Sequence, residues 1–90
     1  MPKIRIRFFA NLREHTKTKE LVLEGMTVRE ILDKICKKFP GLESLLFNGD
    51  KLRPYMNVFL NGRDVSGLEG METELHTDDE IAIFPPVSGG

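Results

Sequence analysis

One amphipathic helix, predicted between Thr27 and Phe39, constrains the fold of this 90-residue chain more than any other feature. Thr27 and Glu30 have the spacing of a capping box, in which the threonine hydroxyl accepts the N–H of Glu30 and the glutamate reaches back. Apolar residues then recur every three or four positions on one face: Val28, Ile31, Leu32, Ile35, Cys36 and Phe39. Pro40 and Gly41 end the helix. Because the periodicity predicts no second long helix, a sheet must cover this apolar face.

Alternation of apolar and polar residues predicts the strands of that sheet. Residues 3–8 alternate strictly, with Ile4, Ile6 and Phe8 directed to the core. A polar stretch at residues 11–18 separates this strand from a second one at residues 20–24. Because the connection is so local, we expect the two strands to form an antiparallel hairpin.

The second half of the chain predicts three further strands. Residues 41–54 form a connecting segment with a short helical turn, and residues 56–60 read as a strand. Asn61 and Gly62 give a strong hairpin-turn signal before a short return strand at residues 63–65. After a loop marked by glycines, residues 80–84 form the last strand.

The predicted order is therefore β-β-α-β-β-β, with the first and last strands parallel at the centre of one mixed sheet. This is an α+β fold of the β-grasp type. We expect it to occupy residues 1–84, followed by an extended tail at residues 85–90.

Three phenylalanines fall on the face of the sheet opposite the helix. When the apolar alternation of each strand is directed inward, Phe9, Phe59 and Phe84 are left pointing outward. An exposed apolar patch of this kind needs a cover. Leu45, Leu46 and Phe47 could fold over it, but a partner-binding surface is favoured because interfaces use aromatic anchors.

The chemistry of an independent enzyme is missing from the sequence. His15 and His76 are far apart among polar residues, and no spacing resembles a metal site. Cys36 lies on the apolar face of the helix, where a thiol packs in the core. Acidic residues 78–80 are typical of a solvated turn. We therefore expect no bound cofactor or metal.

Charge and composition limit the classes of partner that we expect this chain to bind. The net charge is −1, which gives no general attraction to nucleic acid or anionic membranes. Lys3, Arg5 and Arg7 share one strand face, a weak signal for nucleic acid. No apolar stretch approaches the roughly 20 residues that span a bilayer. Because Cys36 is the single cysteine, no internal disulfide can form, and we expect a cytoplasmic location.

The C-terminal tail carries the strongest functional signal. Its residues are Pro85, Pro86, Val87, Ser88, Gly89 and Gly90. The two prolines end the strand because they cannot donate a ladder hydrogen bond. Fully extended, six residues reach roughly 20 Å, and a terminus without Cβ atoms can enter a narrow channel. A frayed end or a cloning remnant is the alternative, but the tail continues directly from a strand.

A terminal glycine suits acyl chemistry. The carboxylate of Gly90 is ionised at neutral pH and can attack the α-phosphate of ATP. A sulfur donor can then displace AMP from the acyl-adenylate and leave a thiocarboxylate, with no side chain crowding the carbonyl carbon. The fixed φ angles of Pro85 and Pro86 reduce the entropy lost when the tail enters a partner.

These residues resemble the small subunit of molybdopterin synthase, the MoaD-like sulfur carriers of the MoaD/ThiS group. The resemblance covers nearly the whole chain and is carried by Arg7-Phe8-Phe9-Ala10, Leu12-Arg13-Glu14, the capped helix, Leu60-Asn61-Gly62 and the stretch from Asp79 to Gly90. It implies a ubiquitin-like β-grasp fold and a thiocarboxylate on Gly90.

The resemblance also implies partners. An E1-like, MoeB-like enzyme would adenylate Gly90 with ATP and Mg²⁺, and a sulfur donor would follow. The tail would then enter the large, MoaE-like synthase subunit and give its sulfur to cyclic pyranopterin monophosphate. Phe9 and Phe84 fall on the partner surface of such carriers. The chain would thus be a sulfur-carrying subunit without an active site of its own.

Other functions remain open at this stage. Residues 41–54 and 67–73 look enlarged relative to short members of the group, which affects partner geometry. A ubiquitin-like modifier would join Gly90 to lysines, and related carriers deliver sulfur to thiamine or tRNA. A plain adaptor domain is a further alternative. The sequence does not distinguish carrier from modifier, because both begin with the same adenylate.

Overall fold

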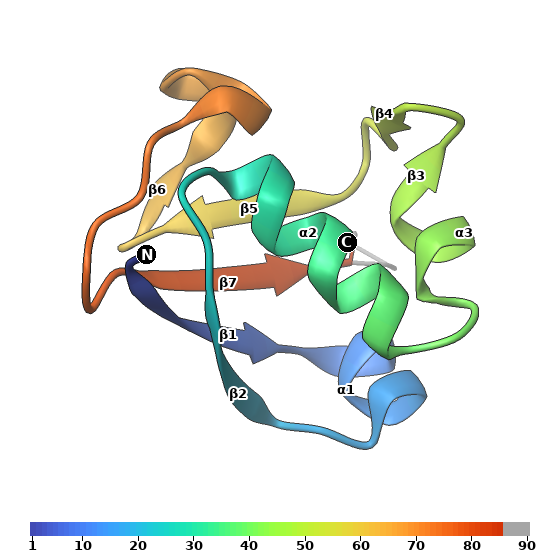
Figure 1. Cartoon of the computed structure of the whole chain (residues 1–90). Helices are drawn as coiled ribbons and strands as arrows, with labels where there is room; N and C mark the ends of the chain where they lie inside the picture. The colour runs from blue at the N-terminus through green and yellow to red at the C-terminus, as the bar shows by residue number, and fades with distance from the viewer. Residues whose placement is uncertain (86–90) are drawn as a thin grey trace.

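A five-stranded mixed sheet with one long helix across it forms the body of the protein (Figure 1). The computed structural model describes residues 1–85. The strands, in the spatial order of the sheet, are β2 (Glu20–Glu24), β1 (Lys3–Phe8), β7 (Glu80–Phe84), β5 (Asn57–Leu60) and β6 (Arg63–Asp64). The predicted β-grasp architecture is confirmed.

The first and last strands lie side by side at the centre. β1 and β7 run parallel, with Ile6 opposite Ile81. β2 is antiparallel to β1, and β5 is antiparallel to β7. The turn between β5 and β6 has positive φ at both Asn61 (50°) and Gly62 (85°), as the hairpin signal predicts. The Asn61 side chain also accepts the N–H of Glu80 at 2.9 Å, which ties this turn to the start of β7.

Helix α2 (Val28–Lys38) begins at the predicted capping box. The Thr27 hydroxyl accepts the N–H of Glu30 at 3.2 Å. The Glu30 carboxylate reaches back to the N–H of Met26 at 2.6 Å, and so satisfies a donor in the residue before the cap. The N–H of Phe39 closes the last turn on the carbonyl of Ile35 at 2.9 Å.

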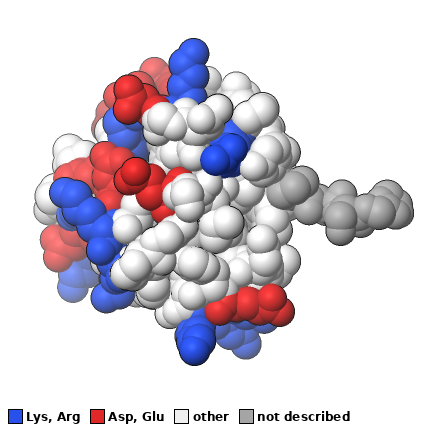
Figure 2. All heavy atoms as spheres, turned by 90° about the vertical axis from the view of Figure 1, so that its right-hand side faces the viewer, with Lys and Arg blue, Asp and Glu red and all other residues white. Residues whose placement is uncertain are grey.

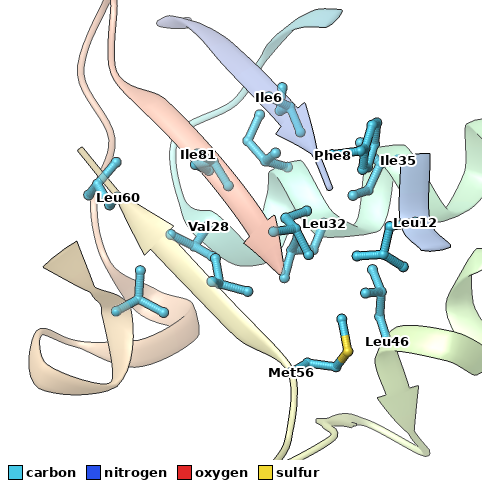
Figure 3. Packing of buried hydrophobic residues seen from close by; sticks show 14 of the residues in the cluster. Ile6, Phe8, Leu12, Val28, Leu32, Ile35, Leu46, Met56, Leu60 and Ile81 are labelled. Carbon is cyan, nitrogen blue, oxygen red and sulfur yellow. The ribbon is translucent and has the colours of Figure 1, made fainter. Parts of the chain in front are cut away.

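The core lies between α2 and the inner face of the sheet (Figure 3). Ile6, Ile81 and Leu32 are fully buried there, together with Phe8 and Leu12. Each such side chain contributes about 1.5–3 kcal/mol when it is removed from water. The alternating residues predicted to face inward are the ones that do so.

A short helix, α1 (Ala10–Thr16), replaces the polar loop expected between β1 and β2. The two strands pair as predicted, but the connection is helical. Leu12 enters the core, and the Thr16 hydroxyl donates to the Leu12 carbonyl at 2.9 Å. Lys17 ends the helix with a left-handed φ of 54°. One buried leucine in a polar stretch is too weak a period to predict a helix.

The connecting segment 41–54 contains the expected helical turn and an additional hairpin. Helix α3 (Leu42–Leu46) is followed by β3 (Phe47–Asn48) and β4 (Lys51–Leu52), which pair with each other. The predicted strand at residues 63–65 is shorter, because Val65 begins the 3₁₀ turn η1 (Val65–Gly67). The expected loop beyond it holds a second turn, η2 (Gly70–Glu72). No helix within residues 1–85 is long and apolar enough to cross a membrane.

Candidate functional site

The three outward phenylalanines meet in one aromatic cluster: Phe9, Phe59 and Phe84. Phe84 stacks on Phe9, with ring centroids 4.5 Å apart and planes at 17°. Phe59 meets Phe84 edge-on at 5.5 Å and 81°. All three side chains are partly buried, so they form a preformed apolar surface rather than loose exposed rings. Such pairs are worth about 0.5–1.5 kcal/mol each beyond area burial.

The register of the sheet puts the aromatic cluster on its outer face. Phe84 is opposite Asn57, and Phe59 is opposite Ala82, so both rings project from the outer face of adjacent strands. Phe9 follows β1 with extended backbone, φ −131° and ψ 155°, at the start of α1. It therefore continues the outer face of β1 beside β7. The cluster lies where β7 ends and the tail begins.

The residues proposed as a cover lie elsewhere. Leu46 is fully buried and Phe47 is 8% exposed, and both belong to the core. Leu45 is partly buried and also packs against the core. The reading in which Leu46 and Phe47 fold over the aromatic cluster is therefore wrong. Their burial arises from α3, which turns them inward beside α1 and α2.

Arginines surround the Phe9 end of the cluster. The guanidinium carbons of Arg7 and Arg13 lie 5.4 and 5.8 Å from the Phe9 ring centroid. At exposed sites such contacts are worth about 0.5–1 kcal/mol. Arg7 also pairs with Glu80 at 3.5 Å, and Arg5 pairs with Glu20 at 3.6 Å. These pairs reduce the positive charge that the row of cations on β1 presents to a partner.

The side of the molecule that carries α1, α3 and the end of β7 has few charges at its centre. Figure 2 views the side of Figure 1 that carries α1, α3 and the end of β7, and white atoms occupy most of its centre. Charged side chains lie mainly toward the margins of this view. A surface with few charges at its centre and charges at its rim is the usual anatomy of a protein–protein contact.

The predicted tail residues are only partly described. Pro85 is partly buried and follows β7 directly. Pro86, Val87, Ser88, Gly89 and Gly90 lie outside the described residues. The division into a domain at residues 1–84 and a tail at residues 85–90 therefore stays a prediction.

Cys36 is not poised for nucleophilic chemistry. It lies partly buried on α2, and it packs against the core as the sequence predicts. Burial raises the pKa of the Cys36 thiol to about 11, with smaller contributions from the carboxylates of Glu43 and Asp33. The thiol is therefore protonated at neutral pH. Among residues 1–85, no three His, Cys, Asp or Glu side chains are grouped as metal ligands.

Sequence reasoning missed two residues beside Pro85. Tyr55 is 49% exposed, and Arg53 lies next to it in the turn before β5. Both line a groove that Pro85 also lines. The one available signal was Pro54 within the segment 41–54, since proline before a strand favours a turn that presents the next residue.

Relatives in sequence cover almost the whole chain. A sequence model of the ThiS family matches residues 6–90. Small archaeal modifier protein 3 of Haloferax volcanii is 36% identical over 91 residues, which is 98% of this chain and 99% of that protein. The molybdopterin synthase sulfur carrier subunit of Arabidopsis thaliana is 32% identical over 91 residues, or 98% of this chain and 83% of that protein.

Solved structures agree in fold. Small archaeal modifier protein 1 from Methanosarcina acetivorans superimposes with a TM-score of 0.90 at 41% identity, over 100% of this chain and 98% of that one. A chain in the Amycolatopsis orientalis BexX/CysO complex gives 0.88 at 33% identity, over 97% and 99% of the two chains. The fold is thus the ubiquitin-like β-grasp, and the resemblance to the MoaD/ThiS group is confirmed. This chain belongs to the ThiS family, among ubiquitin-like sulfur carriers and modifiers.

Proposed function

We propose that this chain carries sulfur as a thiocarboxylate on Gly90 and donates it to cyclic pyranopterin monophosphate during molybdopterin synthesis. Phe84 is the observation that carries this proposal. It ends β7, stacks in the aromatic cluster, and stands six residues before the terminal Gly90. A partner that binds the cluster therefore holds the root of the tail and directs the terminus into its own active site.

The chemistry proceeds through an acyl-adenylate. A carboxylate oxygen of Gly90 attacks the α-phosphate of ATP, and pyrophosphate leaves. Sulfur at the hydrosulfide level, from the sulfur donor, then adds to the acyl carbon and displaces AMP. The thiocarboxylate sulfur then attacks a carbon of the acceptor, and an oxygen substituent leaves that carbon. Water hydrolyses the acyl–sulfur bond, which leaves a thiol on the acceptor and restores the carboxylate of Gly90. Glycine favours each attack because no Cβ shields the carbonyl.

Two enzymes complete this proposal. An E1-like, MoeB-like enzyme would supply ATP, Mg²⁺ and the adenylation site, and a MoaE-like large subunit would hold the pterin substrate. The Arabidopsis relative, named a molybdopterin synthase sulfur carrier subunit, supports this acceptor. The BexX/CysO complex, in which a similar chain occurs, supports a partner enzyme of some kind. We place the reaction in the cytoplasm, without nucleic acid or membrane.

The proposed reaction uses no catalytic side chain from this chain. Within residues 1–85 the single thiol, Cys36, has a raised pKa, and no ligand cluster for a metal is formed. We propose that the chain holds no cofactor of its own and that ATP and Mg²⁺ are bound by the activating enzyme. The reacting atom is its terminal carboxylate.

Conjugation to proteins is the second candidate. The similarity to small archaeal modifier protein 3 along 98% of the chain favours it. A lysine amine would attack the same adenylate or a thioester derived from it, and an isopeptide bond to Gly90 would form. The two functions share their first step and differ in the nucleophile that follows.

Reconstitution tests the proposal. The purified chain is incubated with the adenylating enzyme of its own cells, MgATP and sulfide, and its intact mass is measured. We expect a species heavier by the difference between sulfur and oxygen, localised to Gly90. Two matched variants, one lacking Gly90 and one with an alanine added after it, should keep the fold and gain no sulfur.

The outcomes separate the candidates. Transfer of this sulfur to cyclic pyranopterin monophosphate, on addition of the large subunit, supports the molybdopterin assignment. Isopeptide bonds between Gly90 and lysines of cell proteins, without a thiocarboxylate, would favour the modifier. Sulfur gain by the variant lacking Gly90 would overturn the proposal.

A further inference from the structure

A groove of about 390 Å³ lies beside the root of the tail, on the enlarged segment to which the proposed function gives no role. Helix α1 contributes one wall, and the stretch from α3 to the start of β5 contributes the other. Its lining includes Asn11, Leu45, Arg53, Tyr55, Met56 and Pro85. Met56 is 7% exposed and anchors the groove to the core, whereas Tyr55 stands open to solvent. The groove thus combines apolar side chains with polar groups and one cation.

Tyr55 is held in place by a turn. The N–H of Met56 donates to the carbonyl of Arg53 at 3.0 Å, which closes a tight turn with Pro54 and Tyr55 at its tip. Pro54 fixes φ at its position, and buried Met56 fixes the end of the turn. An exposed tyrosine on such a rigid support loses little entropy on binding. Tyrosine is also among the residues enriched at interface hot spots.

Hydrogen bonds hold Arg53 in place and leave part of its guanidinium group for a partner. Its Nε donates to the Ser44 carbonyl at 3.0 Å, and its backbone N–H donates to the Leu46 carbonyl at 2.8 Å. The ion pairs formed among residues 1–85 do not include Arg53. The guanidinium therefore keeps its outer N–H donors for a carboxylate on another molecule.

The tail is short, so an enzyme that binds Gly90 must come close to this groove. Five residues follow Pro85, and they span at most about 17 Å. A typical interface covers about 800 Å² on each partner, equivalent to a disc of about 16 Å radius. Since Pro85 itself lines the groove, an enzyme that binds both Gly90 and the root of the tail has the groove within reach of its surface.

We propose that this groove is a second docking site for the enzyme that adenylates Gly90. It receives an apolar side chain between Tyr55 and Pro85, next to an acidic group that pairs with Arg53. The inference rests on the proposed adenylation of Gly90, and holds for carrier and modifier alike because they share that step. The segment 41–54 would then have a function, because it forms this contact surface beside the aromatic cluster.

Pyrophosphate exchange tests the groove. Labelled pyrophosphate is incorporated into ATP by the adenylating enzyme of the same cells, at increasing concentrations of the intact chain. We expect Tyr55→Ala and Arg53→Glu each to raise the half-saturating concentration about tenfold. Arg53→Gln should raise it less, because it removes the attraction without adding repulsion. Met26→Ala is the matched control, since Met26 has the same 49% exposure as Tyr55 but lies outside the groove.

The inference and the proposed function fail in different ways. Unchanged half-saturation for both Tyr55→Ala and Arg53→Glu would overturn the groove, even if deletion of Gly90 abolished exchange. Exchange that persisted without Gly90 would overturn the proposed function itself. Thermal unfolding of each variant shows that the fold is kept, and the surface change Arg53→Glu provides a readout if Tyr55→Ala proves unstable.

Discussion

Ile83 and Phe84 are neighbours on β7 and lie on opposite faces of the sheet. Ile83 is completely buried in the hydrophobic core, opposite Val58. Phe84 projects from the other face, only partly buried, and packs against Phe9 and Phe59. One residue step therefore separates the layer that holds the fold together from the surface that we assign to partners.

The single strand β7 thus contributes to both stability and partner binding. The inner face is closed by the helix and contributes to stability through burial. The outer face keeps an aromatic surface that the fold does not need to cover, next to the tail that must be delivered. Because the cluster is preformed, a partner gains apolar contact with little ordering of side chains. The predictions below test whether the two faces differ in this way.

The largest expected effect is on the inner face. Ile83→Ala should lower the free energy of unfolding by about 3 kcal/mol, since it removes a fully buried side chain and leaves a cavity. Urea denaturation of the purified variant measures this loss. A loss below about 1 kcal/mol would mean that the inner layer adjusts easily, which contradicts a tightly packed core.

Phe84→Ala should act mainly on binding. We expect its affinity for the adenylating enzyme to fall about 30-fold, as for an aromatic hot spot. Its stability should fall by only about 1–2 kcal/mol, from the lost ring contacts. Titration calorimetry and urea denaturation measure the two quantities. A stability loss equal to that of Ile83→Ala, with affinity unchanged, would make Phe84 a core residue.

The reactivity of Cys36 tests how well the edge of the core is protected from solvent. Because burial raises the pKa of its thiol to about 11, the thiolate is scarce near pH 8. Alkylation by iodoacetamide should be roughly tenfold slower than for a free thiol at pH 8, and should accelerate toward pH 11. Stability also depends on the protonation of this thiol. The folded state favours the neutral thiol, so its contribution to the free energy of unfolding is lost as pH rises through 11. Alkylation as fast as that of a free thiol would show that α2 opens readily.

The smallest effect is expected at the charged margin of the outer face. Glu20→Gln removes the 3.6 Å ion pair with Arg5, in which both side chains are about half exposed. The change in unfolding free energy should stay within about 0.5 kcal/mol. Urea denaturation at low and high salt measures it. A loss near 2 kcal/mol would place part of the stability on the face assigned to binding.

Strong periodicity made much of the fold predictable. The alternation of β1, the capping box of α2 and the Asn-Gly turn each have a local physical cause that can be read without the tertiary structure. The outward position of Phe59 and Phe84 followed from the same alternation, because each alternates with buried residues of its strand.

The elements that were missed have no such local signal. Helix α1 buries Leu12 and Thr16 alone, and the β3–β4 hairpin has strands of two residues. These elements form because α2 and the sheet provide a surface for Leu12, Leu46 and Phe47. The groove at Tyr55 depends on how the segment packs against α1, so no pattern within the segment could predict it.

The intact mass of the protein from its own cells tests the central claim most directly. We predict a fraction that is heavier by the difference between sulfur and oxygen, with the change located on Gly90 by fragmentation. Growth that demands molybdopterin should increase this fraction. An unmodified terminus under those conditions, with no Gly90 attached to lysines, would contradict the account and leave an adaptor domain.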